Sequence, residues 1–354
     1  EKRRWGELGS VWETRGDEPL FSEKELRRWA RAHPLNSGGM TGWTGALVTQ
    51  LFAADAKLGA DLAELWARPP DAWVDPDCAA VAFRATDGWF VGPEDKQRPI
   101  AAPQVMRRVA TAVAMRKAHP LVKEYCLRRG QFGPGGEEHV LAYTIGALLD
   151  AECGGTVMTM DRSKSYQSVR RDAVYLAVKD LLSTVTDGQK DAAAALVTAA
   201  RQYYADHDTL PRTSVNFREL EQVQEVSALP QGCTLSPALH AVVLAWNAGR
   251  VDVNKTCLAL AAHDDLRVSC GANPSSVADF KAPSCERVGG GYNPTKSKVC
   301  GAAAMAVKVV NPGVHVVRSL TLWGRPVGDV GEWFGGVWKD KWGARLRNLR
   351  EMAK

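Results

Sequence analysis

The sequence predicts an α+β fold in which helices flank a small antiparallel sheet. Residues 155–161 form a short β-rich run that ends in an aspartate. Residues 256–269 form an apolar run that stops at Asp264 and Asp265 and then resumes as Leu-Arg-Val, which is typical of a strand, a tight turn and a second strand. Much of the remaining chain has apolar residues at helical spacing, so the acidic strands are expected to lie beside several helices.

The expected elements follow from local patterns in chain order. Ser22 and Glu25 form the Ser-x-x-Glu pattern of a capping box, which predicts a helix over 22–32. Ser236 followed by Pro237 is typical of a helix start and predicts a helix to about Trp246. Apolar spacing and turn residues predict helices at 42–67, 102–129, 139–151, 171–204 (broken at Asp187-Gly188) and 276–288, a short strand within 73–90, a hairpin or loop at 206–224, and a strand pair at 307–327.

The adjacent carboxylates of Asp264 and Asp265 carry the first chemical signal. Two negative charges side by side repel each other unless a cation lies near them, and Mg²⁺ is commonly held by one or two carboxylates. A pair of this kind is also common as solvated turn residues or helix caps, so the pair alone does not define a site. Asp161 ends the other β-rich run 103 positions earlier (264 − 161), and only folding can bring it to the same place.

Other segments with distinctive residues lie around the three acids in a fixed order. They are Ser37-Gly-Gly-Met-Thr-Gly-Trp43, Arg98-Pro-Ile-Ala101, Gln131-Phe-Gly133, Asp161 to Val169, Gln231-Gly-Cys-Thr-Leu-Ser-Pro237, Ala262-His-Asp-Asp265, Asn293-Pro-Thr-Lys-Ser-Lys298 and Leu322-Trp-Gly324. In this order the segments resemble the successive motifs of a reverse transcriptase, most closely that of non-LTR (LINE-type) retrotransposons. The resemblance covers residues 37 to 330 approximately.

The resemblance implies a right-hand polymerase with fingers and palm, an antiparallel palm sheet flanked by helices, and a thumb that is largely absent. It divides the chain into an N-terminal helical extension (1–90), fingers (91–156), a palm with motifs A to D (157–310), and a primer-grip hairpin with the start of a thumb (311–354). The implied activity is that of an RNA-directed DNA polymerase, which joins nucleotides to a primer 3′-hydroxyl on an RNA template.

The resemblance also assigns the catalytic roles. Asp161, Asp264 and Asp265, together with the backbone carbonyl of Arg162, are expected to hold two Mg²⁺ or Mn²⁺ ions. Two such ions activate the attacking hydroxyl and stabilise the leaving oxygen, and they offset the mutual repulsion of clustered carboxylates. Lys298 is the expected general acid toward pyrophosphate, with Lys296 as the alternative. A plain surface lysine is the competing interpretation for either position.

Substrate contacts are implied at further positions. Tyr166 is expected to lie under the incoming sugar, where a bulky ring excludes a ribose 2′-hydroxyl, although a core aromatic residue is the simpler interpretation. Lys96 and Arg98 are expected to hold triphosphate oxygens, or else to be solvated surface charges. Gln231 and Gly232 are expected at the templating pair, where glycine permits a positive φ or a close backbone approach.

One motif departs from the family pattern. The family usually has an aromatic and then a small residue before the aspartate pair, whereas this chain has Ala262 and His263. The histidine adds bulk and a titratable group next to the acids. This departure motivates an alternative, a domesticated and inactive reverse-transcriptase-like domain that binds RNA as a scaffold subunit. A telomerase-type polymerase with a dedicated RNA is a third interpretation.

Composition limits the remaining classes of protein. The formal net charge of +5 over 354 residues suits a nucleic-acid partner, and 45% hydrophobic residues suit a chain with a sizeable core. The eight cysteines show neither Cys-x-x-Cys nor zinc-finger spacing, and no apolar stretch reaches 18 residues, so neither a zinc site nor a membrane span is expected. Expected partners are template RNA, primer, dNTPs and further subunits or missing thumb and endonuclease domains. The family implies a nuclear location, with a mitochondrial one as the alternative.

Overall fold

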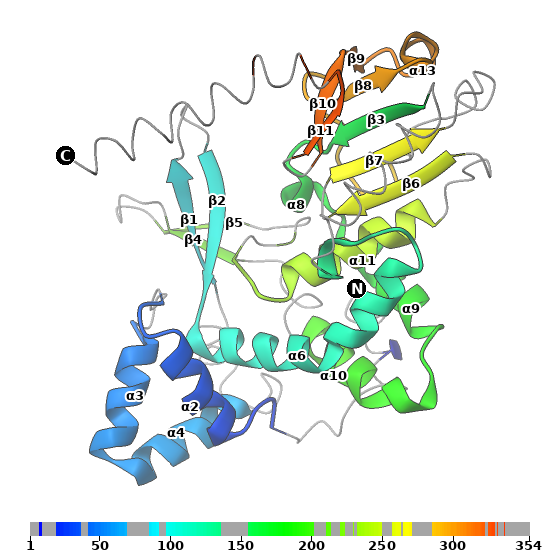
Figure 1. The fold of residues 1–354 in the computed structure, drawn as a ribbon. Coiled ribbons are helices and arrows are strands. Elements are labelled where there is room, and N and C mark those ends of the chain that lie inside the picture. Colours follow the sequence, from blue (N-terminus) through cyan, green and yellow to red (C-terminus); the bar gives the residue numbers. More distant parts are fainter. Residues whose placement is uncertain are drawn as a thin grey trace. The chain divides into compact units, whose positions relative to one another are not determined.

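The computed structural model describes residues 7–8, 19–36, 42–68, 85–91, 97–135, 155–201, 210–213, 220–223, 229, 232–249, 257–262, 265–270, 285–322, 325–329, 331 and 336. Helices and two larger sheets alternate along these segments, which confirms the predicted α+β class (Figure 1). None of the helices in these segments is long and apolar enough to cross a membrane.

The chain forms two compact units, each built from two separated segments. The first unit contains Glu1–Tyr125 and Lys164–Val243, and the second contains Cys126–Ser163 and Leu244–Lys354. The two units therefore interleave in sequence, and the four-part division at residues 90, 156 and 310 stays a prediction.

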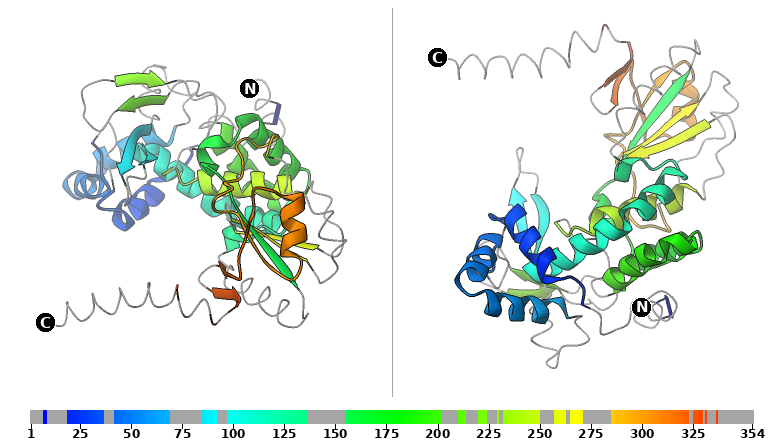
Figure 2. Two further views of the ribbon diagram at one scale, coloured as in Figure 1. Left: turned by 90° about the horizontal axis from the view of Figure 1, so that it is seen from above. Right: turned by 60° about the horizontal axis from the view of Figure 1, so that its bottom comes forward.

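Three short helices stand at the start of the first unit. They are α2 (Glu23–Ala32), α3 (Gly45–Ala54) and α4 (Ala56–Ala67), drawn in blue in Figure 2. The expected capping box is present: the Ser22 hydroxyl accepts from the Glu25 amide, and the Glu25 carboxylate accepts from the Ser22 amide. Leu26, Trp29 and Ala30 form the buried side of α2.

The rest of the first unit combines long helices with a four-stranded sheet. Its helices are α6 (Val105–Leu127, which ends in the second unit), α8 (Ser165–Ser168), α9 (Arg171–Leu182), η5 (Asp187–Gln189), α10 (Lys190–Ala200) and α11 (Ser236–Ala248, which also ends in the second unit). The sheet has the order β2 (Gln97–Pro103), β1 (Ala85–Val91), β4 (Leu210–Thr213) and β5 (Leu220–Val223). The predicted break at Asp187 is confirmed, and α11 begins at Ser236. Of the hairpin or loop expected over 206–224, the described residues form the antiparallel pair β4 and β5.

The second unit is built on a five-stranded sheet. Its order is β6 (Cys257–Ala262), β7 (Asp265–Cys270), β3 (Thr156–Asp161), β8 (Lys298–Gly301) and β9 (His315–Val316). The first four strands are antiparallel, as expected, whereas β9 pairs parallel with β8. The two predicted acid-bearing strands, β3 and β7, are therefore neighbours at the centre of this sheet (Figure 1).

Helix α13 (Ala304–Val310) covers one face of this sheet (Figure 2). Its residue Val307 packs in a buried cluster with Met158 and Met160 of β3 and Val299 of β8. Because successive side chains of a strand point to opposite faces, Asp161 belongs to the face that α13 does not cover. The buried cluster around Val307 thus lies on one side of β3, and Asp161 belongs to the other, where it follows the buried Val157 and Thr159.

Two sequence expectations change in this region. The strand pair predicted over 307–327 is wrong at its start, where residues 304–310 form α13, and the pair is β10 (Ser319–Leu322) with β11 (Arg325–Gly328). A short apolar run does not distinguish a buried helix from a strand, which explains the error. Of the helix predicted over 276–288, residues 285–288 form a turn and the remainder lies outside the described residues, as does the helix predicted over 139–151.

Candidate active site at the ends of strands β3 and β7

Asp161 and Asp265 are register partners across the antiparallel strands β3 and β7. Residues directly opposite each other in such a pair share a face of the sheet, with Cβ atoms ~5 Å apart. Ala262 also pairs with Asp265, so β6 and β7 form a hairpin joined by His263 and Asp264, which lie outside the described residues. The backbone positions of two of the three predicted acids therefore pair at one end of the sheet.

The strand that carries Asp161 is buried along its length and opens only at its last residue. Residues 156–160 of β3 are buried, whereas the Asp161 side chain is 25% exposed. Thr156 anchors the far end of the strand, where its hydroxyl accepts from the Ala303 amide at 2.9 Å. The strand thus presents a partly exposed carboxylate at the end of a buried support.

A lysine lies directly on the Asp161 carboxylate. Lys296 Nζ is 3.2 Å from Asp161 Oδ2, and the lysine side chain itself is 62% exposed. Lys298, the residue first expected as general acid, lies in β8 opposite Thr159, and its backbone carbonyl accepts from the Thr159 hydroxyl at 3.4 Å. The structure therefore places Lys296, the alternative, in contact with the acid.

Local geometry explains why Lys296 reaches the acid. The Asn293 side chain accepts from the backbone amide and hydroxyl of Thr295 (3.1 and 2.7 Å), and the Asn293 carbonyl accepts from the Lys296 amide (3.2 Å). This tight turn is joined to β3, because the Asn293 amide donates to the Asp161 carbonyl at 2.7 Å. The turn thus holds Lys296 at the end of the strand.

Arg162 strengthens the same junction. Its guanidinium is buried and its Nη2 donates to the Gly289 carbonyl at 2.5 Å, while its backbone bridges Tyr292. Two hydrogen bonds make this bridge. The Asn293 amide donates to the Asp161 carbonyl, and the Ser163 amide donates to the Gly291 carbonyl. Whether the Arg162 carbonyl binds metal stays a prediction, but its side chain has a clear structural role in fixing the loop.

Two titratable groups near Arg162, Tyr292 and Cys285, have raised pKa values. Burial raises the pKa of Tyr292, and the neighbouring Cys285 adds to that effect. Burial likewise raises the pKa of the Cys285 thiol, against a smaller opposing effect of Arg162 and the hydrogen bond to Tyr292. Because neither group ionises near neutral pH, neither competes with Asp161 for a cation.

The predicted segment Gln131-Phe132-Gly133 lies at the other edge of the hairpin. The Phe132 amide donates to the Ala261 carbonyl and the Ala261 amide donates to the Gly130 carbonyl, both at 2.7 Å. Gln131 bridges Ala261 in the parallel direction, and its side-chain oxygen accepts from the Gly133 amide at 3.0 Å. This segment therefore extends the sheet beside the strand that leads into the aspartate turn.

Tyr166 lies in the first unit, in α8, stacked on a histidine that the sequence analysis missed. The rings of Tyr166 and His240 are parallel within 13°, with centroids 4.3 Å apart, and the Ser165 hydroxyl lies 2.7 Å from His240 Nε2. The sequence signal that could have identified it is a histidine four residues after Ser236 in a mostly apolar helix.

The remaining predicted substrate residues are partly described. Gly232 has a φ of +107°, a conformation that favours glycine, and its expected place at the templating pair stays a prediction. Arg98 lies in β2 opposite Phe90, in the sheet of the first unit. Lys96, Gln231 and Asp264 lie outside the described residues.

The described part of the donor set is compatible in chemistry with a divalent metal ion. Asp161 offers a partly exposed carboxylate opposite a second acidic position, and Mg²⁺ prefers such oxygen ligands. In the part of the chain that the structure describes, no three His, Cys, Asp or Glu side chains cluster closely enough for a metal. Asp264 and the Asp265 side chain, two of the three predicted ligands, lie outside that part.

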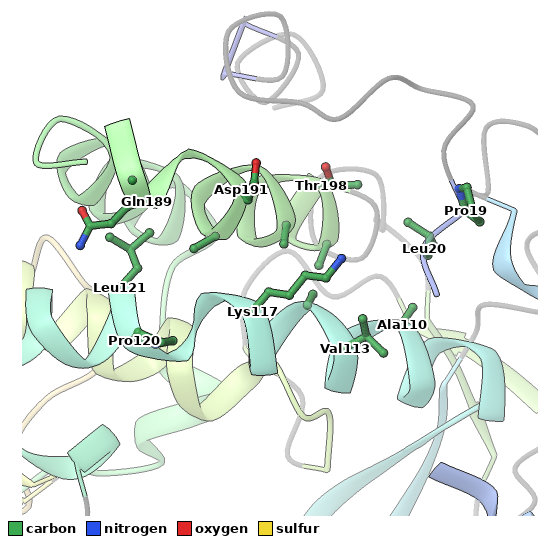
Figure 3. A pocket seen from close by; sticks show the side chains of 15 residues that line it. Pro19, Leu20, Ala110, Val113, Lys117, Pro120, Leu121, Gln189, Asp191 and Thr198 are labelled. Atoms are coloured by element: carbon green, nitrogen blue, oxygen red, sulfur yellow. The ribbon is translucent and has the colours of Figure 1, made fainter. Parts of the chain in front are cut away.

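A hollow in the first unit is a separate feature. It has a volume of about 660 Å³ and lies between α6 and α10 of the first unit, where Val113, Lys117, Leu121 and Asp191 are among its lining residues (Figure 3). None of the predicted site residues lines it.

No protein-family model matches the sequence, and no curated protein matches it. Among solved structures, the chain is similar to a telomerase from Candida tropicalis truncated from its C-terminal domain, with a TM-score of 0.48 and 11% identity over 69% of this chain and 53% of that chain. It is similar to a telomerase from Candida albicans in complex with a fragment of telomeric RNA, with a TM-score of 0.46 and 11% identity over 70% of this chain and 44% of that chain. It is also similar to the RNA-dependent RNA polymerase of a human picobirnavirus, with a TM-score of 0.43 and 16% identity over 61% of this chain and 40% of that chain. The chain spans about half of the length of these structures.

Proposed function

We propose that the chain is the polymerase core of a non-LTR-type reverse transcriptase, which extends a primer 3′-hydroxyl with deoxynucleotides on an RNA template. The observation that carries the proposal is the register of Asp161 against Asp265, with Lys296 on the Asp161 carboxylate. The ordered motifs from 37 to 330 agree with it. The proposal also includes the RNA template, the primer, and further domains or subunits of the whole enzyme.

In this proposal, Asp161, Asp264 and Asp265 hold Mg²⁺ or Mn²⁺. Bound divalent ions lower the pKa of the attacking hydroxyl and stabilise the attacking and leaving oxygens of an in-line displacement. Bound ions would also offset the mutual repulsion of the three carboxylates. The turn at 293–296 supports the proposal because it holds the Lys296 ammonium group on Asp161, from where it would give a proton to the departing pyrophosphate.

Tyr166 supplies the selection for deoxyribose. Its aromatic ring is bulky enough to exclude a ribose 2′-hydroxyl when the sugar lies against it. The partly exposed ring is held by His240 on one side, which leaves it available as a fixed wall.

Primer extension tests the proposal. Purified protein, a DNA primer annealed to an RNA template, and Mg²⁺ or Mn²⁺ are combined with dNTPs or rNTPs, and the Asp264→Ala/Asp265→Ala double variant is run in parallel. We expect extension with dNTPs that disappears in the double variant. If the wild-type protein binds RNA but extends no primer with either metal, the proposal is wrong and an RNA-binding scaffold takes its place.

A further inference from the structure

We propose that His240 is a positioning residue for sugar selection: its ring, oriented by Ser165, fixes the ring of Tyr166 against the incoming nucleotide. The inference rests on the proposed function, and it adds a residue from α11 to the substrate site.

The contact between the two rings is close and well aligned. The ring centroids are 4.3 Å apart and the planes differ by 13°, so the imidazole covers one face of the phenol. Aromatic stacking adds to the free energy of simple burial, and it restrains rotation of both rings. Tyr166 is therefore supported on the side that His240 occupies.

The histidine is itself fixed. It is fully buried in α11, and its Nε2 lies 2.7 Å from the hydroxyl of Ser165, which is also buried. Rotation of the imidazole would break this hydrogen bond between two buried groups, and a broken hydrogen bond between buried groups costs free energy. Ser165 directly precedes Tyr166, so one short segment supplies both the stacked ring and the group that orients its support.

The backbone of Tyr166 is attached to the same part of the unit. The Tyr166 carbonyl accepts from the amide of the buried Leu229 at 2.9 Å. Leu229 precedes the segment 231–237 and His240 follows it, so both ends of that segment are tied to Tyr166. A movement of either would displace the tyrosine.

Rigidity matters because the two substrates differ by one hydroxyl oxygen. A wall that yields by a fraction of an ångström no longer excludes that atom, so the selectivity depends on the support of the ring as well as on the ring. Loss of an aromatic stack corresponds to about a three- to tenfold change in an equilibrium or rate ratio.

The test compares two substitutions of similar size at one buried position. His240→Leu removes the ring, and His240→Phe keeps a ring that can stack. Ser165→Ala removes only the hydroxyl, and Val242→Ala is the control, because it trims a buried residue two positions along the helix and so on another face. For each protein, kcat and KM are measured separately for a dNTP and the matching rNTP on one primed RNA template, together with the melting temperature.

We expect His240→Leu to lower the dNTP-over-rNTP ratio of kcat/KM by about three- to tenfold, through better use of the rNTP. His240→Phe should keep most of the selectivity, Ser165→Ala should lose about twofold, and Val242→Ala should lose stability without a change in the ratio. A folded His240→Leu protein with the wild-type ratio overturns the inference, and so does a His240→Phe protein that loses as much selectivity as His240→Leu. If neither His240 variant folds, an unchanged ratio in Ser165→Ala overturns it. Absence of extension by the wild-type chain overturns the proposed function instead.

Discussion

Asp161 and Asp265 face each other across β3 and β7 in the last register pair of the two strands. The arrangement places two like charges at adjacent positions, which is unfavourable without a cation. Lys296 supplies one positive charge at 3.2 Å from Asp161. In the proposed function, a metal ion would balance the remaining negative charge.

Replacement of Asp161 by asparagine keeps the side-chain shape and removes the charge. We expect Asp161→Asn to lower primer extension by at least about a hundredfold, because the metal-binding charge is lost. It should also weaken Mn²⁺ binding, measured by titration followed by electron paramagnetic resonance. Asp187→Asn is the matched control, since the Asp187 side chain is 96% exposed. Equal activity of Asp161→Asn and wild type would exclude Asp161 from the site.

The two candidate lysines differ in their position. We expect Lys296→Ala to reduce kcat by about a hundredfold, because general-acid catalysis typically contributes that much. Lys298→Ala should have a smaller effect, since Lys298 lies in β8 opposite Thr159. Single-turnover rates of nucleotide addition measure both. A larger loss for Lys298→Ala would return the role to Lys298, as first expected from the sequence.

Gly301 closes β8 in a conformation that other residues adopt poorly. Its φ is +115°, and an added Cβ would lie 2.7 Å from Thr156 Cα and still closer to the Gly155 carbonyl oxygen. We expect Gly301→Ala to lower the free energy of unfolding by about 2–4 kcal/mol. Urea denaturation measures the change. Gly291→Ala is the control in the same unit, because open space surrounds Gly291, and equal stability losses in both would contradict the account.

The capping box of α2 is a second stability test. Ser22→Ala removes the acceptor of the Glu25 amide and should cost about 1 kcal/mol. Ser22→Thr keeps a hydroxyl and should be nearly neutral. Hydrogen exchange at the amides of the first helical turn, compared with thermal unfolding, measures the effect. Similar losses for both variants would mean that the hydroxyl does not cap the helix.

Two buried thiols predict an alkaline limit to stability. Burial raises the pKa of Cys126 to about 12, against a smaller effect of Arg129, and raises the pKa of Cys300 to about 11, from an ordinary value of 9.0. Above about pH 9 the unfolded chain releases these protons and the folded chain keeps them. Their contribution is therefore complete below pH 9 and declines toward pH 11 and 12.

Iodoacetamide labelling followed by mass spectrometry checks the thiols directly. At pH 8, Cys126 and Cys300 should react slowly in the folded protein and rapidly in urea, because only the thiolate is nucleophilic. Rapid labelling of either thiol without denaturant would contradict the assigned burial. A urea-unfolding series from pH 7 to 11 should show the loss of stability beginning near pH 9.

Strands β3, β6 and β7 of the second unit were predictable because their apolar runs adjoin acids. The apolar runs before Asp161 and Asp264 indicated strands, and the acid pair indicated the turn between β6 and β7. Their meeting depends on contacts between residues about a hundred positions apart. The order of the motifs, rather than local pattern, is what predicted that meeting.

The details that were not predicted depend on contacts that form only after folding, or on segments too short to show a pattern. The choice between Lys296 and Lys298 follows from the turn that Asn293 closes, and sequence spacing allows either lysine. His240 was hidden in an apolar helix, where a buried polar residue reveals its partner only after folding. The helix α13 was mistaken for strand because its seven residues are too few to show a period.

The most direct measurement is the rate at which one dATP or one ATP is added to a DNA primer on an RNA template with Mg²⁺, by the wild-type chain and by Asp161→Asn. The account predicts addition of dATP in preference to ATP by the wild type, and loss of both reactions in Asp161→Asn with RNA binding retained. Addition that survives in Asp161→Asn, or RNA binding by the wild type without any addition, would contradict it.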